Sequence, residues 1–327
     1  MNKCLALLAS AALLSTSVCA QTQPQVTVFG LLDLSVGETK APGGISNRSV
    51  DSGKMTTSHF GLRGSEDLGG GLSAVFRLEH FLRANMGESG RFNGDAFWSR
   101  NATVGLSHRE WGTVTLGRNT TPLFVATIVF NPFGDSFGYS PAVRHYFTSG
   151  TVTGDSGWND SIVYSSPAFG GVRFGAAITT DTNGAGGRNT GFNVGYSGGP
   201  LSAALVYQDV DKDGATPVQD TRTWQLSGAY QLSVAKLFAQ FGKVDNKTTG
   251  NSYDLAGFGA SAPVGAGSVL AYWGQIKPAT GAKRTTLTVG YDHFLSKRTD
   301  VYAVAMSDKL SGLSSGHGDS LGLRHRF

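Results

Sequence analysis

Apolar and polar side chains alternate along most extended stretches of this chain, and this period of two restricts the fold more than any other feature. From Val26 to Val36 every second residue is Val, Gly or Leu, and most of the residues between them are polar or aromatic. The same alternation returns around Phe76, Phe241 and Leu323. It is typical of β-strands that have two different faces. The sequence therefore predicts an all-β protein.

The connections between these stretches are alternately short and long. Seven short connections and eight long ones can be distinguished, and the longest is 119–157. This pattern implies sixteen antiparallel strands. An even number of strands with short turns at one end is typical of transmembrane β-barrels, which face lipid outside and water inside. A barrel of sixteen strands is wide enough for an aqueous channel.

Composition excludes several other classes of protein. The 19 Phe, 10 Tyr and 5 Trp are too many for a disordered chain. The 46 glycines have no period of three, which excludes a collagen-like helix, and Gly and Thr are poor helix formers. The net charge of +4 is small and spread along the chain, so no nucleic-acid partner is expected.

The first 20 residues have the pattern of a secretory signal peptide. A basic residue, Lys3, precedes an apolar stretch, and a site of small residues ends at Ala20. Cleavage there would leave 21–327 as a single barrel and would remove both cysteines. No later stretch of 18 apolar residues follows.

Five segments resemble the general porins of Gram-negative bacteria, of the β-proteobacterial and neisserial type. In chain order they are VTVFGLLDLSVG, HFGLRGSEDLGGGLSAVFRLE, ATVGLSHREWGTVTLGRN, NDSIVYSSPAFGGVRFGAA and LGLRHRF. The resemblance covers essentially the whole mature chain. It implies a trimeric outer-membrane barrel for passive diffusion of small hydrophilic solutes and ions. Its implied partners are identical subunits, membrane lipid, lipopolysaccharide and the barrel-assembly machinery. In the family this machinery recognises a C-terminal phenylalanine, which is Phe327 in this chain.

The resemblance also implies a constriction of the pore. In the family the third external loop folds inward, and 119–157 lies at its position. The turn Asn131-Pro132-Phe133-Gly134-Asp135 resembles the family turn that places a carboxylate at the constriction, so Asp135 is the acidic candidate. Arg118 and Arg100 match arginines of the opposite wall, although the alternation along the following strand points Arg100 outward.

The alternation itself places further charges on the lumen face. Arg63 and Arg77 join the basic wall, and Asp33, Glu79 and Lys236 are other lumen charges. The family usually has arginine where this chain has His59, and often has basic residues where it has Trp158 and Val163. The excess of arginine indicates a mild preference for anions.

Two alternative functions remain open at this point. A substrate-specific channel of the same architecture would need aromatic residues along the lumen, and Phe29 and Trp158 are the candidates. An outer-membrane barrel enzyme is the remote alternative. The two Gly-x-Ser-x-Gly matches, 134–138 and 195–199, lack the helix that a nucleophile elbow requires. The histidines are not spaced as metal ligands, so no catalytic residue, metal or cofactor is expected.

Overall fold

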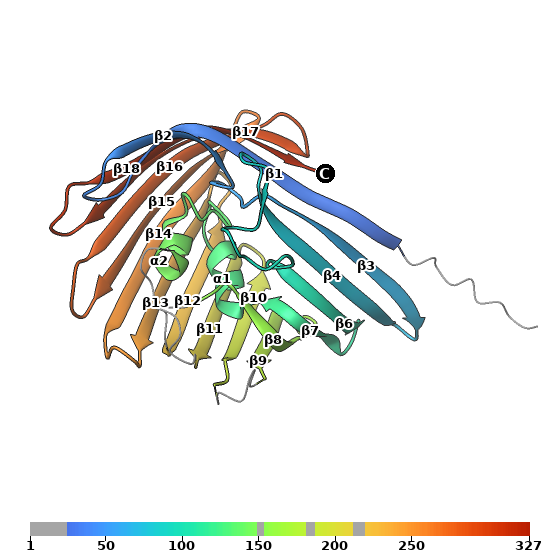
Figure 1. The fold of residues 1–327 in the computed structure, drawn as a ribbon. Coiled ribbons are helices and arrows are strands. Elements are labelled where there is room, and N and C mark those ends of the chain that lie inside the picture. Colours follow the sequence, from blue (N-terminus) through green and yellow to red (C-terminus); the bar gives the residue numbers. More distant parts are fainter. Residues whose placement is uncertain (1–24, 149–153, 181–186, 212–219) are drawn as a thin grey trace, which may run out of the picture.

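The computed structural model describes residues 25–148, 154–180, 187–211 and 220–327. The predicted signal peptide and its cleavage site lie outside these residues. In Figure 1 the strands form a curved wall around two short helices. The helices are α1 (Pro122–Val129) and α2 (Pro141–Phe147). The strands are β1 (Gln25–Lys40), β2 (Ser46–Ser52), β3 (His59–Gly69), β4 (Leu72–Arg83), β5 (Glu88–Ser89), β6 (Asn101–His108), β7 (Gly112–Thr120), β8 (Gly157–Ser165), β9 (Val172–Thr179), β10 (Thr190–Gly198), β11 (Leu201–Val210), β12 (Thr221–Gln231), β13 (Lys236–Asn246), β14 (Ser252–Val264), β15 (Gly267–Pro278), β16 (Arg284–Phe294), β17 (Thr299–Leu310) and β18 (Gly316–Arg326).

These strands make a closed antiparallel barrel with sixteen positions in its wall. β2 and β3 both pair with β1 and together occupy one position, while β5 has only two residues and pairs with the end of β4. The wall closes where β1 pairs with β18 from Leu31 to Lys40. Closure leaves no sheet edge with unpaired backbone groups, which the interior of a lipid bilayer requires. The predicted sixteen-stranded barrel is confirmed.

The two faces of the wall differ as the alternation predicts. On β1, Val26 and Val28 are each 61% exposed, whereas Asp33 and Ser35 on the opposite face are buried. Leu321 of β18 is 64% exposed on the outer face. Apolar side chains therefore cover the outside, where lipid solvates them. Within the described residues, no helix is long and apolar enough to cross a bilayer.

The first external connection differs from its predicted limits. The sequence predicts a loop over 37–57, but β1 continues to Lys40 and pairs with β2. The chain leaves the wall only at 53–58, and Gly53 makes this turn with a φ of +73°. β2 has only one apolar residue, Val50, which is 58% exposed and lies opposite Val36 of β1, so its sequence shows no alternating apolar stripe. Hydropathy alone therefore could not reveal this strand.

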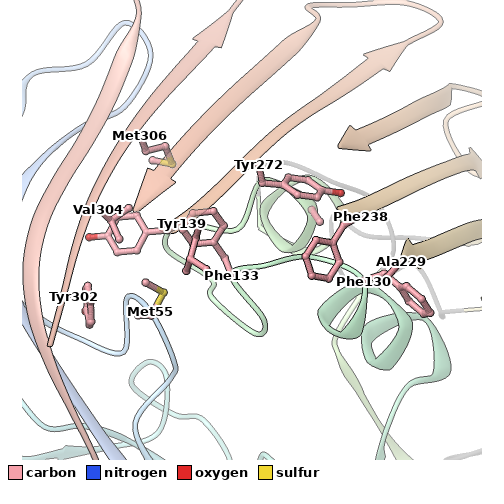
Figure 2. Packing of buried hydrophobic residues seen from close by; sticks show 12 residues of the cluster. Met55, Phe130, Phe133, Tyr139, Ala229, Phe238, Tyr272, Tyr302, Val304 and Met306 are labelled. Atoms are coloured by element: carbon pink, nitrogen blue, oxygen red, sulfur yellow. The ribbon is translucent and has the colours of Figure 1, made fainter. Parts of the chain in front are cut away.

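The largest buried cluster lies between the wall and the segment that joins β7 to β8. It contains Phe130, Phe133 and Tyr139 of that segment, with Met306 and other side chains from the wall. Figure 2 shows Phe133 and Tyr139 lying toward β17 and Phe130 lying toward Phe238 of β13. The packed core of this protein is therefore formed by one connection against the inner face of the barrel.

Candidate functional site

The segment 121–156 begins each of its two helices at a hydroxyl residue followed by proline. The side chain of Thr121 accepts a hydrogen bond from the backbone N–H of Phe124 (3.2 Å), and Ser140 accepts one from Val143 (3.3 Å). A capping hydroxyl and a proline in the first turn are both typical of a helix start. The Thr-Pro and Ser-Pro pairs are the sequence signal that could have predicted these helices.

The turn between the helices carries Asp135. Asn131 stabilises this turn, because its side chain accepts from the N–H of Phe133 (2.9 Å) and donates to the carbonyl of Gly134 (3.0 Å). Ser136 Oγ then donates to the carbonyl of Lys54 (2.8 Å), in the part of the chain that leaves the wall between β2 and β3. The position of Asp135 is thus fixed from both sides.

Asp33 in turn holds residues 54–56 in place. Its carboxylate accepts hydrogen bonds from the backbone N–H groups of Met55 (2.8 Å) and Thr56 (2.7 Å) and from the hydroxyl of Tyr302 (2.7 Å). The sequence places Asp33 among the lumen charges. In the structure it is completely buried, so it positions the chain beside Asp135 and is not accessible to a passing ion.

Helix α2 is attached to the opposite wall by charged and polar contacts. Arg144 donates to Asp308 of β17 (2.8 Å), which also pairs with Arg284 of β16. His145 hydrogen-bonds Thr286 (3.0 Å), and the hydroxyl of Tyr139 donates to Ser320 (2.6 Å). The segment therefore extends from β7 to strands β16 to β18.

Helix α1 is attached by glutamines of β12 and β13. Gln225 donates to the hydroxyl of Thr127 (3.1 Å), and Gln240 donates to its carbonyl (2.9 Å). Both glutamines lie on the face of the wall opposite to the exposed Leu226 and Phe241, which is the inner face. These contacts place α1 on the lumen side of the wall, as Figure 1 also shows.

Arg63 and Arg77 form the most exposed part of the basic wall. They are direct partners across β3 and β4, and their guanidinium groups lie 4.9 and 5.4 Å from the ring centre of Phe29. The side chain of Arg77 is 47% exposed and also pairs with Glu79 (2.8 Å). Phe29 therefore supports the two cations.

Arg100 connects this wall to Asp135. It precedes β6, so the strand's alternation does not determine its direction. Its Nε lies 3.5 Å from Glu79 Oε1, and its Nη2 lies 3.8 Å from Asp135 Oδ2. Glu79 is completely buried and also accepts a hydrogen bond from Asn101. Glu79 therefore holds the arginines in position, and Asp135, 20% exposed, is the more accessible carboxylate.

The other predicted site residues lie in different surroundings. Arg118 donates to the carbonyl of Ser99 and to Asn159 (2.8 Å), and it pairs with Asp155. It thus joins the two ends of the segment and makes none of its described contacts with Asp135. His59 is 8% exposed, with Nδ1 2.9 Å from the carbonyl of Thr57. Lys236 lies over the ring of Phe238, at 5.2 Å.

Comparison with known proteins identifies the family to which this barrel belongs. A family model described as Gram-negative porin matches residues 6–313. The chain belongs to this family.

Relatives and solved structures agree with this assignment. Outer membrane porin protein 32 of Delftia acidovorans is 36% identical over 96% of this chain and 90% of its own length. An outer membrane porin protein of Bordetella pertussis is 29% identical over 98% of this chain and 99% of its own. The structure of an anion-selective porin from Comamonas acidovorans matches with a TM-score of 0.80 at 29% identity, covering 93% of this chain and 100% of that one. The predicted family, the outer-membrane location and the passive channel function are confirmed, and both family and fold indicate a channel and not an enzyme.

This porin has a second charge cluster that the sequence did not predict. Arg91 pairs with Asp95 (2.9 Å) and with Asp155 (3.0 Å), so the connection after β4 holds the end of the segment 121–156. Burial alone would raise the pKa of Asp95, but its hydrogen bonds to Arg91 lower that pKa to about 2. The pKa of Asp155 is likewise lowered, because Arg91 and Arg118 outweigh its burial. Both carboxylates therefore stay ionised at pH values below the ordinary pKa of aspartate, and this contact weakens only at strongly acidic pH.

The attachment of α2 is expected to weaken at a milder pH. Burial lowers the pKa of His145 to about 3, the charges of Arg284 and Arg144 act in the same direction, and Asp308 opposes them. A detached histidine titrates near 6.5 and takes up a proton below that pH, whereas the docked one stays neutral. Docking is therefore fully stable above pH 6.5 and loses about 1.4 kcal/mol per pH unit as the pH falls toward 3.

Hydrogen exchange of the backbone amides of residues 142–147 measures this effect. Between pH 7 and pH 5 the protection, corrected for the intrinsic rate, is expected to fall by about 30-fold. In His145→Gln the fall should disappear, because glutamine can still bond Thr286 but does not titrate. An equal fall in both proteins would show that another group is responsible.

Proposed function

We propose that the segment 121–156 narrows the channel, and that the ions passing this point meet an excess of positive charge. Arg63, Arg77 and Arg100 face Glu79 and Asp135, which leaves one net positive charge. The observation that carries the proposal is the difference in exposure. Arg77 is 47% exposed, whereas Glu79 is buried and neutralised by its partners. Fixed charges at a constriction bias which ion enters, so a mild preference for anions follows.

The electric field between Asp135 and the arginines of the opposite wall also selects solutes. Asp135 belongs to the segment and the arginines belong to the wall or its rim, so a dipolar solute is oriented as it passes between them. An apolar solute would have to displace the water bound to these charges, and it is disfavoured. Small hydrophilic solutes and ions are therefore the expected cargo, moved by their own gradients without any catalytic step.

The assembly of the protein follows the same family pattern. We propose that the chain is exported with cleavage after Ala20 and forms a homotrimer in contact with outer-membrane lipid and lipopolysaccharide. Phe327 supports a role as the signal for the barrel-assembly machinery, because its N–H and carbonyl pair with Gly30 where the barrel closes. It also remains 45% exposed.

A planar bilayer experiment tests the channel proposal. The purified mature protein is inserted, and the reversal potential is measured across a tenfold gradient of potassium chloride. We expect conductance steps in groups of three and a reversal potential whose sign shows that chloride permeates more readily than potassium. A potential of the sign for potassium would contradict the arginine wall, and a folded barrel without conductance would contradict the diffusion channel.

A further inference from the structure

A cavity of about 710 Å³ lies inside the barrel, between α1 and the wall made by β8 to β11. This size is typical of a binding site for a small molecule. It is separate from the charges around Asp135, none of which lines it. Its lining on the inner face of the wall and on α1 includes Val125, Val129, Val163, Arg173, Asn193 and Ala204.

One side of the cavity is apolar and uncovered. Val125 and Val129, one turn apart on α1, are 46% and 52% exposed although α1 lies within the barrel. Val163 of β8 and Ala204 of β11 continue this surface on the wall. In a water-filled lumen an apolar surface of this kind gains free energy when an apolar group covers it. No part of the described chain does so.

The other side of the cavity holds one charge. Arg173 of β9 is exposed, lies on the inner face and forms no ion pair with the described residues. Its partner across the strand pair is Gly195, and Ser197 and Ser202 also line the cavity here. These small side chains leave room beside the guanidinium. Asn193 adds an amide that can donate a hydrogen bond.

We propose that this cavity binds small organic anions that carry an apolar body, such as aromatic or branched carboxylates. The carboxylate would pair with Arg173 and the apolar body would cover Val125 and Val129. The described lining contains a single charged side chain and no carboxylate, so it matches a monoanion and disfavours cations. The proposal deepens the channel function, because a solute reaches the cavity through the lumen. It gives this porin a binding site for one class of solute in addition to unselective diffusion.

Calorimetric titration of the detergent-folded protein with 3-phenylpropionate tests the site without requiring conductance. Saturable binding is expected, whereas acetate, which lacks the apolar body, and 3-phenylpropanol, which lacks the charge, should bind at least about tenfold more weakly. Arg173→Gln should weaken binding of 3-phenylpropionate by about tenfold or more, the effect of losing a charge-assisted hydrogen bond. Lys236→Gln is the matched control, because it removes one positive charge from the inner wall outside the cavity.

A double variant tests the apolar side separately. Val125→Ser with Val129→Ser should weaken 3-phenylpropionate about fivefold and leave the weak binding of acetate unchanged. Both valines are exposed, so folding is preserved, and the shift in electrophoretic mobility on heating checks it. Equal weakening by Arg173→Gln and Lys236→Gln would show only a general effect of lumen charge and would overturn the site. Saturable binding in a protein that does not conduct would instead support the site and contradict the channel.

Discussion

Replacing Arg63, Arg77 and Arg100 together by glutamine is expected to reverse the ion preference from anions to cations. The three substitutions leave Glu79 and Asp135 as the only charges of this group, so one net positive charge becomes two net negative charges. At about 8 Å in water each unit charge changes the energy of an ion by about 0.5 kcal/mol, so the three changes disfavour an anion about tenfold and favour a cation about tenfold, or about a hundredfold in the permeability ratio. The reversal potential in a potassium chloride gradient measures this change.

Two further variants separate the charge effect from a disturbed fold. The triple variant leaves the buried Glu79 without its arginines, so adding Glu79→Gln removes that unpaired charge. Asp135 alone then remains, and a weaker cation preference is expected. Arg48→Gln at the exposed outer rim is the control and should keep the preference for anions. An anion preference that survives in the triple variant would show that other lumen charges control selectivity.

Asp308→Ala is expected to detach α2 from the wall. Asp308 is 1% exposed and pairs with both Arg144 and Arg284, whose side chains are only 18% and 16% exposed. Removing one partner of a buried ion pair typically costs about 3–5 kcal/mol, because the remaining charge stays buried and unpaired. The backbone amides of residues 142–147 should lose their protection from hydrogen exchange, and the open-channel current should become larger and noisier.

An apolar replacement of the whole cluster identifies the cause of this effect. With Asp308→Leu, Arg144→Met and Arg284→Met together, no charge is left unpaired, so α2 should stay attached more firmly than in Asp308→Ala. Asp319→Ala, which removes an exposed carboxylate of β18, should change neither measurement. Unchanged protection in Asp308→Ala would mean that Tyr139, His145 and the buried aromatic side chains hold the helix without this ion pair.

Much of the barrel could be predicted because the environment of each side chain depends on its position within its own strand. Successive side chains on a strand face lipid and the interior in turn, so the alternation of apolar and polar residues indicates which environment each residue faces. This is why the outward direction of Val26 and Leu321 and the number of wall positions follow from the chain alone. The strand β2 could not be predicted in this way, because Val50 is its only apolar residue and a single residue shows no alternation.

The candidate site was predictable only in part, because its charges come together through contacts distant in the sequence. Arg63 and Arg77 follow from alternation and share the ring of Phe29. Arg100 lies outside any strand, and only its contacts with Glu79 and Asp135 reveal its direction. Arg118 has the expected residue type, yet Asp155 and the carbonyl of Ser99 use its donors. No pattern within one segment indicates which of several arginines such a partner will bind.

The sequence by itself determined the all-β architecture, the sixteen wall positions and the family, and it singled out Asp135 as the acidic candidate of the segment 121–156. Only the tertiary structure decided where that segment lies, because its position depends on Asp308, Thr286 and Ser320, more than a hundred residues away along the chain. It also decided that Asp33 and Glu79 are buried supports. A strand pattern reports the face that a side chain occupies, whereas burial and pairing depend on which other segments reach that face.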